Sequence, residues 1–140
     1  MIASTSRAVP TTFHRFGRQH RARAGLRIEI AAAIGTAPTE LAAFDAALRA
    51  VGVGDVNLIR LSSVIPPRST LTGVDQVRQE FEWGDRLYCV YAEQHASVPG
   101  QQAAAGIGWI LRDDDSGAGL FVEHEADSQA EVEDLIENSL

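Results

Sequence analysis

The chain has 140 residues and a mass of 15.1 kDa, which is the size of one domain with a sizeable core. Hydrophobic residues make up 45% of it, which excludes a disordered chain, and no apolar run approaches the roughly 20 residues that span a bilayer. All twelve basic residues are arginine, so these 140 residues contain no lysine. None of them can therefore hold pyridoxal phosphate as a lysine Schiff base.

The charge is unevenly distributed along the chain. Residues 1–25 carry five arginines and no acidic residue, and they lack an apolar period. We therefore expect a flexible Arg-rich arm over 1–25, followed by one folded domain over 26–140. That remainder holds seven arginines against nineteen acids, a net charge of −12. A strongly acidic body argues against nucleic acid as a partner and favours cationic small molecules.

The sequence contains few residues suited to metal or disulfide chemistry. Cys89 is the only cysteine, so an intrachain disulfide or a thiolate metal cluster is not expected. The four histidines show no metal-ligand spacing, and we assign no metal. A reducing, cytoplasmic location fits this composition, and we expect no membrane partner.

Regular structure is predicted to begin near residue 27. Residues 27–34, RIEIAAAI, alternate well enough for a strand. A helix should follow from its N-cap, Thr39, to Ala50, because apolar residues recur there at helical spacing. Residues 55–62 predict a second strand that is apolar enough to be buried.

The second half of the folded region predicts a long polar loop over 66–84, then three strands and a final helix. The strands are predicted over 86–94, 104–111 and 119–125. Ser128 should cap an amphipathic helix with Val132, Leu135 and Ile136 facing inward. This order of elements indicates an α+β domain in which helices pack on a mostly antiparallel β-sheet.

Two adjacent serines, Ser62 and Ser63, stand where the second predicted strand must stop, because Pro66 and Pro67 cannot continue a central strand. Taken alone, the pair is typical of an ordinary strand end, where hydroxyls bond to nearby backbone groups. A second interpretation is chemical. The hydroxyl of the second serine can attack the carbonyl of the first to form an ester, and elimination and hydrolysis then leave a pyruvoyl group. Such a step needs local strain and a polarised carbonyl.

The residues around the serine pair carry a family resemblance. Residues 44–67, FDAALRAVGVGDVNLIRLSSVIPP, closely resemble the signature of pyruvoyl-dependent arginine decarboxylases, where a helix, a Gly-x-Gly turn and NLIR-x-SS-x-x-PP occur in this order. Downstream, SVPG at 97–100 and GLFVEHE at 119–125 are similar to later family segments. The resemblance covers residues 26 to 137, and it implies the sandwich of helices and sheet that this family adopts.

The resemblance also implies site residues. Cleavage would fall between Ser62 and Ser63, and Ser63 would become the N-terminal pyruvoyl group. Asn57 matches the family asparagine of self-processing, Glu123 the glutamate that reprotonates the substrate carbon, and Asp45 the aspartate that meets the guanidinium. Ordinary interpretations remain open for all three: an amide at a strand edge, a carboxylate on a solvated face and an acid on an exposed helix.

The activity implied by the resemblance is that of a carboxy-lyase of polyamine metabolism. L-Arginine would be converted to agmatine and CO2 through a Schiff base with the pyruvoyl group. The resemblance further implies a cytoplasmic homotrimer of autocatalytically cleaved subunits, with active sites between neighbours.

Two departures from the family leave other functions open. The chain ends at Leu140, earlier in the last helix than family members do, so we expect a compact variant or a truncated chain. A catalytically silent relative that acts as a binding or assembly subunit is one alternative. Residues 71–84 also lack the proline-rich lead-in associated with the family. A decarboxylase of another amino acid is therefore the second alternative.

Overall fold

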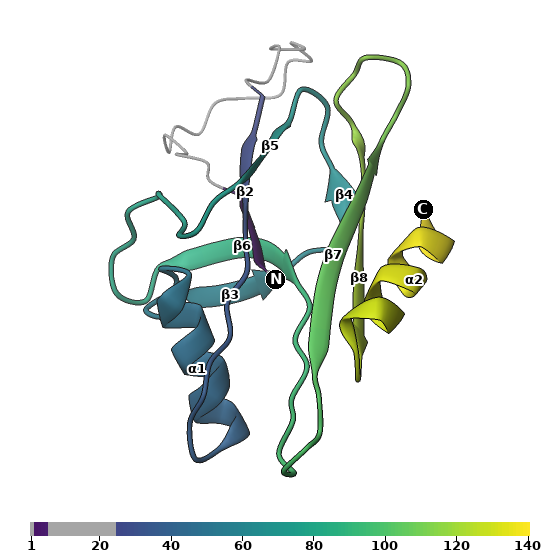
Figure 1. Ribbon diagram of the computed structural model, residues 1–140. Coiled ribbons are helices and arrows are strands. Elements are labelled where there is room, and N and C mark those ends of the chain that lie inside the picture. Colours follow the sequence, from purple (N-terminus) through teal and green to yellow (C-terminus); the bar gives the residue numbers. More distant parts are fainter. Residues whose placement is uncertain (1, 6–24) are drawn as a thin grey trace.

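A computed structural model describes residues 2–5 and 25–140 of the chain (Figure 1). These residues form eight strands and two helices, in agreement with an α+β chain. The strands are β1 (Ile2–Thr5), β2 (Arg27–Ala31), β3 (Asn57–Arg60), β4 (Val64–Ile65), β5 (Thr70–Gly73), β6 (Arg86–Tyr91), β7 (Ala104–Leu111) and β8 (Gly119–Ala126), and the helices are α1 (Glu40–Ala50) and α2 (Gln129–Ser139). Neither described helix is long and apolar enough to cross a bilayer.

The strands form two sheets, with orders β3-β6-β1-β2-β5 and β4-β8-β7. The smaller sheet is antiparallel throughout, whereas the larger one has a parallel pair at each edge, β3 with β6 and β5 with β2. The prediction of a mostly antiparallel sheet is therefore right only in part. The connection from β2 to β3 runs through α1, and a crossover of this kind leaves the two strands pointing in the same direction.

β1 lies inside the larger sheet, within the segment for which the sequence predicts an arm. Ile2–Thr5 pair antiparallel with β2 on one side and with β6 on the other. Their sequence, IAST, has two apolar residues followed by two polar ones and lacks the alternation from which a strand is predicted. For these residues regular structure thus begins earlier than predicted, and residues 6–24 lie outside the described part of the chain.

The segment predicted as a long loop, 66–84, differs in part from its prediction. Thr70–Gly73 form the edge strand β5, and Val77 is buried in a core cluster. The short run TLTG is too polar to predict a strand, yet pairing with β2 provides hydrogen-bond partners for its backbone. The predicted second strand is also shorter and less buried than expected, since Ile59 in β3 is exposed.

Both helices begin at the caps predicted from the sequence. The hydroxyl of Thr39 accepts the backbone N–H of Ala42 at 3.2 Å, and the hydroxyl of Ser128 accepts that of Glu131 at 3.3 Å. The prediction for the inner face of the last helix is right for Val132 and wrong for Leu135, which is exposed. Leu135 lies off the face that packs on β7, which Val132 and Ile136 form one turn apart.

Two apolar clusters hold these elements together. The first packs α1 and the segment after it against the larger sheet, and its buried members are Ala31, Leu48, Val51, Val53, Val77, Leu87 and Cys89. The second is shared by the two sheets, and its buried members are Ile28, Ile30, Ile65, Val90, Ala92, Ile107 and Phe121. Because β4 contributes the fully buried Ile65, the chain just after the serine pair is anchored between the sheets.

Candidate functional site

The serine pair lies where the chain crosses from one sheet to the other. After β3 ends, the N–H of Leu61 still donates to the carbonyl of Cys89 in β6, at 2.9 Å. β4 then begins at Val64, paired with β8 in the smaller sheet. The peptide bond between the two serines therefore lies between two ladders, at a point where the backbone changes partners.

Ser63 is held by hydrogen bonds from its side chain and its backbone. Its hydroxyl donates to the carboxylate of Glu123, 2.7 Å from Oε1 and 2.8 Å from Oε2. Its carbonyl accepts the N–H of Phe121 at 2.7 Å. The N–H of Val64 donates to the carbonyl of Ser62, which closes a three-residue turn around Ser63. The two backbone donors could not be found from residue types, because every residue except proline carries an N–H group.

The strain expected at the serine pair does not take the form of a left-handed backbone. Among the described residues other than glycine, positive φ values occur at Arg68 and Asp115, and neither serine has one. The tight turn between the two sheets is instead defined by the hydrogen bond from Val64 to Ser62.

The alternation of β8 explains how a carboxylate reaches the serine pair. Phe121 is buried in the cluster between the sheets, so Glu123 and Glu125, at steps of two, share its face. The carboxylate of Glu125 accepts the backbone N–H of Glu93, which follows β6 of the larger sheet, at 3.1 Å. His124 lies on the opposite face, where its Nε2 is 2.7 Å from the hydroxyl of Ser139 in α2. This arrangement agrees with the predicted faces of the two glutamates and the histidine.

Asn57 and Asp45, the other two predicted site residues, lie elsewhere in the chain. Asn57 begins β3, at the far end from the serine pair, and its amide donates to the carbonyl of Gly84 at 2.8 Å. Asp45 lies on α1 and forms an ion pair with Arg49 one turn later. Figure 1 shows α1 at the lower left of the molecule, apart from β4, which lies next to β7 and β8. A single chain therefore brings the serine pair to Glu123 but not to these two residues.

Arg60 fixes the end of β3 before the serine pair. Its guanidinium donates to the carbonyl of Tyr91 at 3.1 Å and lies 4.8 Å from the centre of that ring, a cation–π contact. Next to it, burial raises the pKa of the Cys89 thiol to about 11, and the charge of Arg60 opposes this shift. The thiol is therefore protonated at neutral pH and is not a competing nucleophile.

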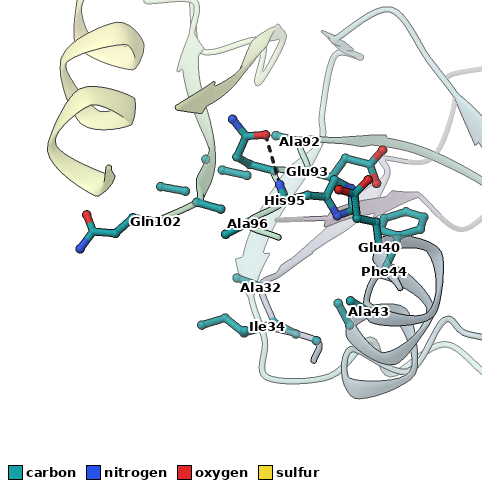
Figure 2. A pocket seen from close by; sticks show the side chains of 18 of the residues that line it. Ala32, Ile34, Glu40, Ala43, Phe44, Ala92, Glu93, His95, Ala96 and Gln102 are labelled. Atoms are coloured by element: carbon teal, nitrogen blue, oxygen red, sulfur yellow. Dashed lines mark hydrogen bonds between the residues drawn. The ribbon is translucent and has the colours of Figure 1, made fainter. Parts of the chain in front are cut away.

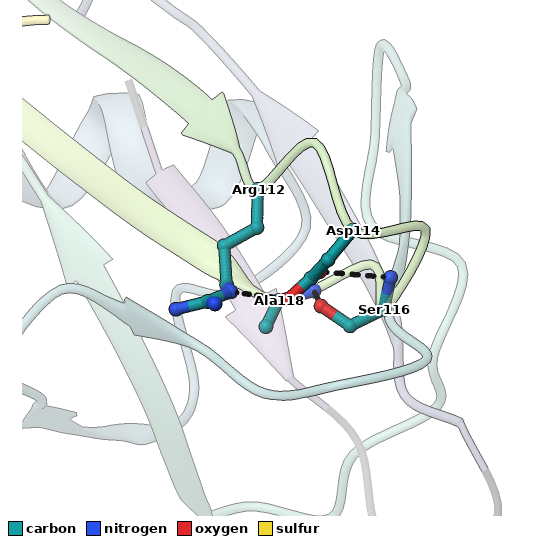
Figure 3. Close-up of polar contacts among 4 residues, drawn as sticks. All are labelled: Arg112, Asp114, Ser116 and Ala118. Atoms are coloured by element: carbon teal, nitrogen blue, oxygen red, sulfur yellow. Dashed lines mark hydrogen bonds and ion pairs between the residues drawn. The ribbon is translucent and has the colours of Figure 1, made fainter.

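The hairpin between β7 and β8 supports the segment that follows β4. In its turn, Asp114 accepts the Nε–H of Arg112 at 2.7 Å and the backbone N–H of Ser116 at 3.1 Å (Figure 3). The hydrogen bond with the Ser116 side chain, followed in size by the one with Arg112, lowers the pKa of Asp114 to about 2. The carbonyl of Ser116 in turn accepts the N–H of Arg68 at 2.6 Å, which ties the hairpin to the chain just past the two prolines.

A hollow of about 1390 Å³ lies apart from the serine pair, bounded by α1, residues 32–39, residues 92–97, β7 and the start of α2 (Figure 2). Alanines make up much of its wall, and Glu40 and Glu93 contribute carboxylates. Neither Ser63 nor Glu123 lines it. Ser63 and Glu123 thus lie outside this hollow, at the junction of the two sheets.

Comparison with known proteins agrees with the signature around the serine pair. The profile of the pyruvoyl-dependent arginine decarboxylase family matches residues 27–140. A protein of that name from Halobacterium salinarum is 46% identical over 97 residues, which are 69% of this chain and 59% of the relative. The namesake from Methanococcus vannielii is 34% identical over 110 residues, 78% of this chain and 65% of the relative. A Methanococcus maripaludis relative, also with this name, is 34% identical over 112 residues, 79% and 66% of the two chains.

The chain thus spans about three fifths to two thirds of the length of these curated relatives. The matched region contains the whole crossing between the sheets, including Ser62, Ser63 and Glu123. On this sequence match, the chain belongs to the family of pyruvoyl-dependent arginine decarboxylases.

Proposed function

We propose that this chain is a self-processing decarboxylase that converts L-arginine to agmatine and CO2, using a pyruvoyl group made from Ser63. The observation that carries the proposal is the hydrogen bond between the hydroxyl of Ser63 and the carboxylate of Glu123, 60 residues later in the chain. By the family resemblance, Ser63 is the residue that becomes the pyruvoyl group, and Glu123 is the residue that transfers the proton to the substrate carbon. Their contact is what a shared site requires.

The surroundings of Ser63 fit a pyruvoyl group. The carbonyl of Ser63 accepts the N–H of Phe121, so the group that would remain next to the new ketone already has an orienting donor. When formed, a pyruvoyl group supplies an electron sink for the pair released as the substrate carboxylate leaves. Glu123, partly buried on the inner face of β8, would then hold the proton that the substrate carbon needs.

The substrate guanidinium would be bound by Asp45 of a neighbouring subunit in a homotrimer. Within one chain Asp45 already pairs with a guanidinium, that of Arg49, which supports a carboxylate suited to this group. We propose that Asn57 also acts from a neighbour, since its amide lies at the other end of β3 from the serine pair. The apolar cluster shared by the two sheets supports the family sandwich as the fold of each subunit. We also propose that this assembly is located in the cytoplasm.

Intact mass of the purified chain, combined with substrate assays, tests the proposal. We expect two pieces, 1–62 and 63–140, of which the second reacts with hydroxylamine, and with cyanoborohydride in the presence of ammonia, because it begins with a ketone. Ser63→Ala should stay in one piece and release no CO2. Carbon dioxide should be released from arginine in preference to neutral amino acids, because Asp45 is an anion. A single unreactive chain would contradict the proposal and favour a catalytically silent assembly subunit, whereas preference for a neutral amino acid would contradict the role of Asp45.

A further inference from the structure

We infer that the guanidinium of Arg60 binds the carboxylate of Ser62 as it leaves during self-processing, and so assists the step in which the ester of the two serines breaks. The inference rests on the proposed function, because it concerns how the same site makes its own reactive group. Arg60 is not among the site residues that the family resemblance implies.

The first observation is where the guanidinium lies along the ladder of β3 and β6. The N–H of Leu61 donates to the carbonyl of Cys89, and bonds of a parallel pair recur at every second residue. The next bond of this ladder would join the N–H of Ser63 to the carbonyl of Tyr91. β3 ends before that point, and the guanidinium of Arg60 donates to this carbonyl instead, at 3.1 Å. The cation therefore lies one ladder step beyond the last bond of β3, at the level of the bond between the two serines.

The second observation is that no carboxylate of a described residue neutralises Arg60. The ion pairs among the described residues are Arg27–Glu29, Arg49–Asp45 and Arg112–Asp114. Arg60 instead stacks on the ring of Tyr91, 4.8 Å from its centre, a contact that orients the guanidinium and leaves its charge in place. A guanidinium has five N–H donors in a planar fork, so one that bonds to a carbonyl can still bind a carboxylate.

The third observation is that the two sides of the serine pair are held by different sheets. The carbonyl of Ser63 accepts the N–H of Phe121, and Ile65 is fully buried, so the chain after the cut stays with the smaller sheet. Ser62 is exposed and follows Arg60 by two residues, at the end of the β3 side. The carboxylate released at Ser62 therefore forms on the side of the cut where the cation lies.

The step to which this cation contributes is a β-elimination. In the ester, the carbonyl carbon of Ser62 is bonded to the side-chain oxygen of Ser63. Water takes the α-proton of Ser63, its electron pair forms a double bond between the α and β carbons, and the bond from the β carbon to oxygen breaks. Ser62 leaves as a carboxylate, and water then replaces the nitrogen of Ser63 as ammonia to give the ketone. Because the ester is neutral and the leaving group is an anion, a cation at this place stabilises the transition state more than the ester.

The species that accumulates during self-processing of the full chain tests this inference. The ester has the mass of the intact chain, but hydroxylamine splits it into 1–62 and a second piece that begins with serine. Samples of wild type and Arg60→Gln are stopped in mild acid over time, and their masses are measured with and without hydroxylamine. We expect Arg60→Gln to accumulate the ester and to form the pyruvoyl piece at least about 10-fold more slowly, the loss typical of removing a charge-assisted hydrogen bond.

Two comparisons separate the charge of Arg60 from a structural role. Arg86→Gln is the matched control, because Arg86 begins β6, at the end of the strand pair away from the serines, and it should process like the wild type. Arg60→Lys keeps a positive charge and should process faster than Arg60→Gln. Guanidinium chloride, well below the concentrations that unfold the chain, should also restore part of the rate of Arg60→Gln.

Circular dichroism checks that each variant is folded. If the glutamine variant is not, Arg60→Met takes its place in every comparison, since its unbranched apolar side chain can still lie against the ring of Tyr91.

The outcomes distinguish this inference from the proposed function. If the wild type splits and decarboxylates arginine while Arg60→Gln forms the pyruvoyl piece at the same rate, the inference is overturned and the proposed function stands. A slow Arg60→Gln chain that resists hydroxylamine would place the role of Arg60 before the ester and would also overturn it. So would an ester that neither the lysine variant nor guanidinium ions help to break. A wild-type chain that never splits removes the proposed function itself.

Discussion

Ser62 and Ser63 are adjacent and chemically identical, but their surroundings are different. Ser63 is partly buried, and its hydroxyl bonds to Glu123, whereas Ser62 is exposed and contributes its carbonyl to the turn. A nucleophile needs a base, and an electrophile needs only a carbonyl with a donor. The pair is therefore asymmetric, and the second serine is the one equipped to attack.

Replacing the first serine tests this asymmetry. Ser62→Ala keeps the backbone carbonyl and its bond from Val64, so we expect the chain still to split into two pieces. Intact mass gives the result directly, with Ser63→Ala as the uncleaved reference. Loss of cleavage in folded Ser62→Ala would mean that the first hydroxyl also takes part.

Cys89 provides a second prediction at this scale. Burial raises its pKa to about 11, so the thiol is protonated well above neutral pH. At pH 8 we expect native protein to react with iodoacetamide at least about 100-fold more slowly than protein in guanidinium chloride. The stability that this neutral thiol contributes should be present below its ordinary pKa of 9.0 and lost as the pH rises toward 11. Equal labelling rates in native and unfolded protein would contradict the burial.

Among the elements, β7 and α2 pack unusually closely. A side chain at Gly108 would overlap Ile136 of α2, and one at Gly106 would overlap Val132. Both glycines belong to the face of β7 opposite the buried Ile107, because successive residues of a strand alternate between its two faces. This close packing holds α2 on the back of the sheet that carries Glu123.

Gly108→Ala should therefore destabilise the fold. We expect a loss of about 1–3 kcal/mol, the range for overpacking a well-packed contact, measured by urea unfolding of the uncleavable Ser63→Ala chain. Gly73→Ala is the matched control in another strand, since a side chain there would meet nothing within 4 Å. A loss as large at Gly73 would indicate a general cost of alanine instead of helix displacement.

The hairpin between β7 and β8 should make the stability of the folded chain depend on pH. Its Asp114 has a pKa lowered to about 2 from 3.8, so its hydrogen bonds stabilise the folded chain above about pH 4 and are lost as the pH falls toward 2. In Ser63→Ala protein, Asp114→Asn should lower the melting temperature at pH 6, and this difference should shrink as the pH approaches 2. Asp113→Asn is the neighbouring control. A difference independent of pH would contradict the role of the charge.

For the whole molecule, the residues of the proposed site are separated in a way that the proposed assembly would have to bridge. Ser63 and Glu123 meet within one chain, whereas Asp45 lies on α1, which Figure 1 shows apart from β4 and β8. The smaller sheet also exposes an apolar row across its three strands, formed by Val64, Leu120 and Ile110. Exposed apolar surface next to a site is typical of a face that packs against another protein.

Mixed assemblies test whether the site is shared between subunits. Ser63→Ala and Asp45→Ala should each lack decarboxylase activity alone. Unfolded together and refolded, they should recover roughly a quarter of the wild-type rate, because random mixing joins an intact Ser63 with an intact Asp45 at one interface in four. Refolding each variant alone is the control. No recovery in mixtures that form trimers by gel filtration would place Asp45 outside the shared site.

The local features of this chain could be read from its residues alone. Thr39 and Ser128 cap helices because their hydroxyls bond to an N–H three residues later. The faces of Glu123 and His124 follow from the alternation of a single strand. The signature around Ser62 and Ser63 likewise predicts the family, which the match over residues 27–140 confirms.

Other features depended on contacts between distant segments. The residues of β1 and β5 do not predict strands by themselves. These segments become strands because β2 provides hydrogen-bond partners for their backbones. The meeting of Ser63 with Glu123 and the donors from Val64 and Phe121 exist because the chain crosses between two sheets at the serine pair. The sequence by itself determined which chemical groups are available, since side-chain chemistry and local periodicity need only neighbouring residues. Only the tertiary structure decided which of those groups touch, because strand pairing and sheet packing join residues far apart in the chain.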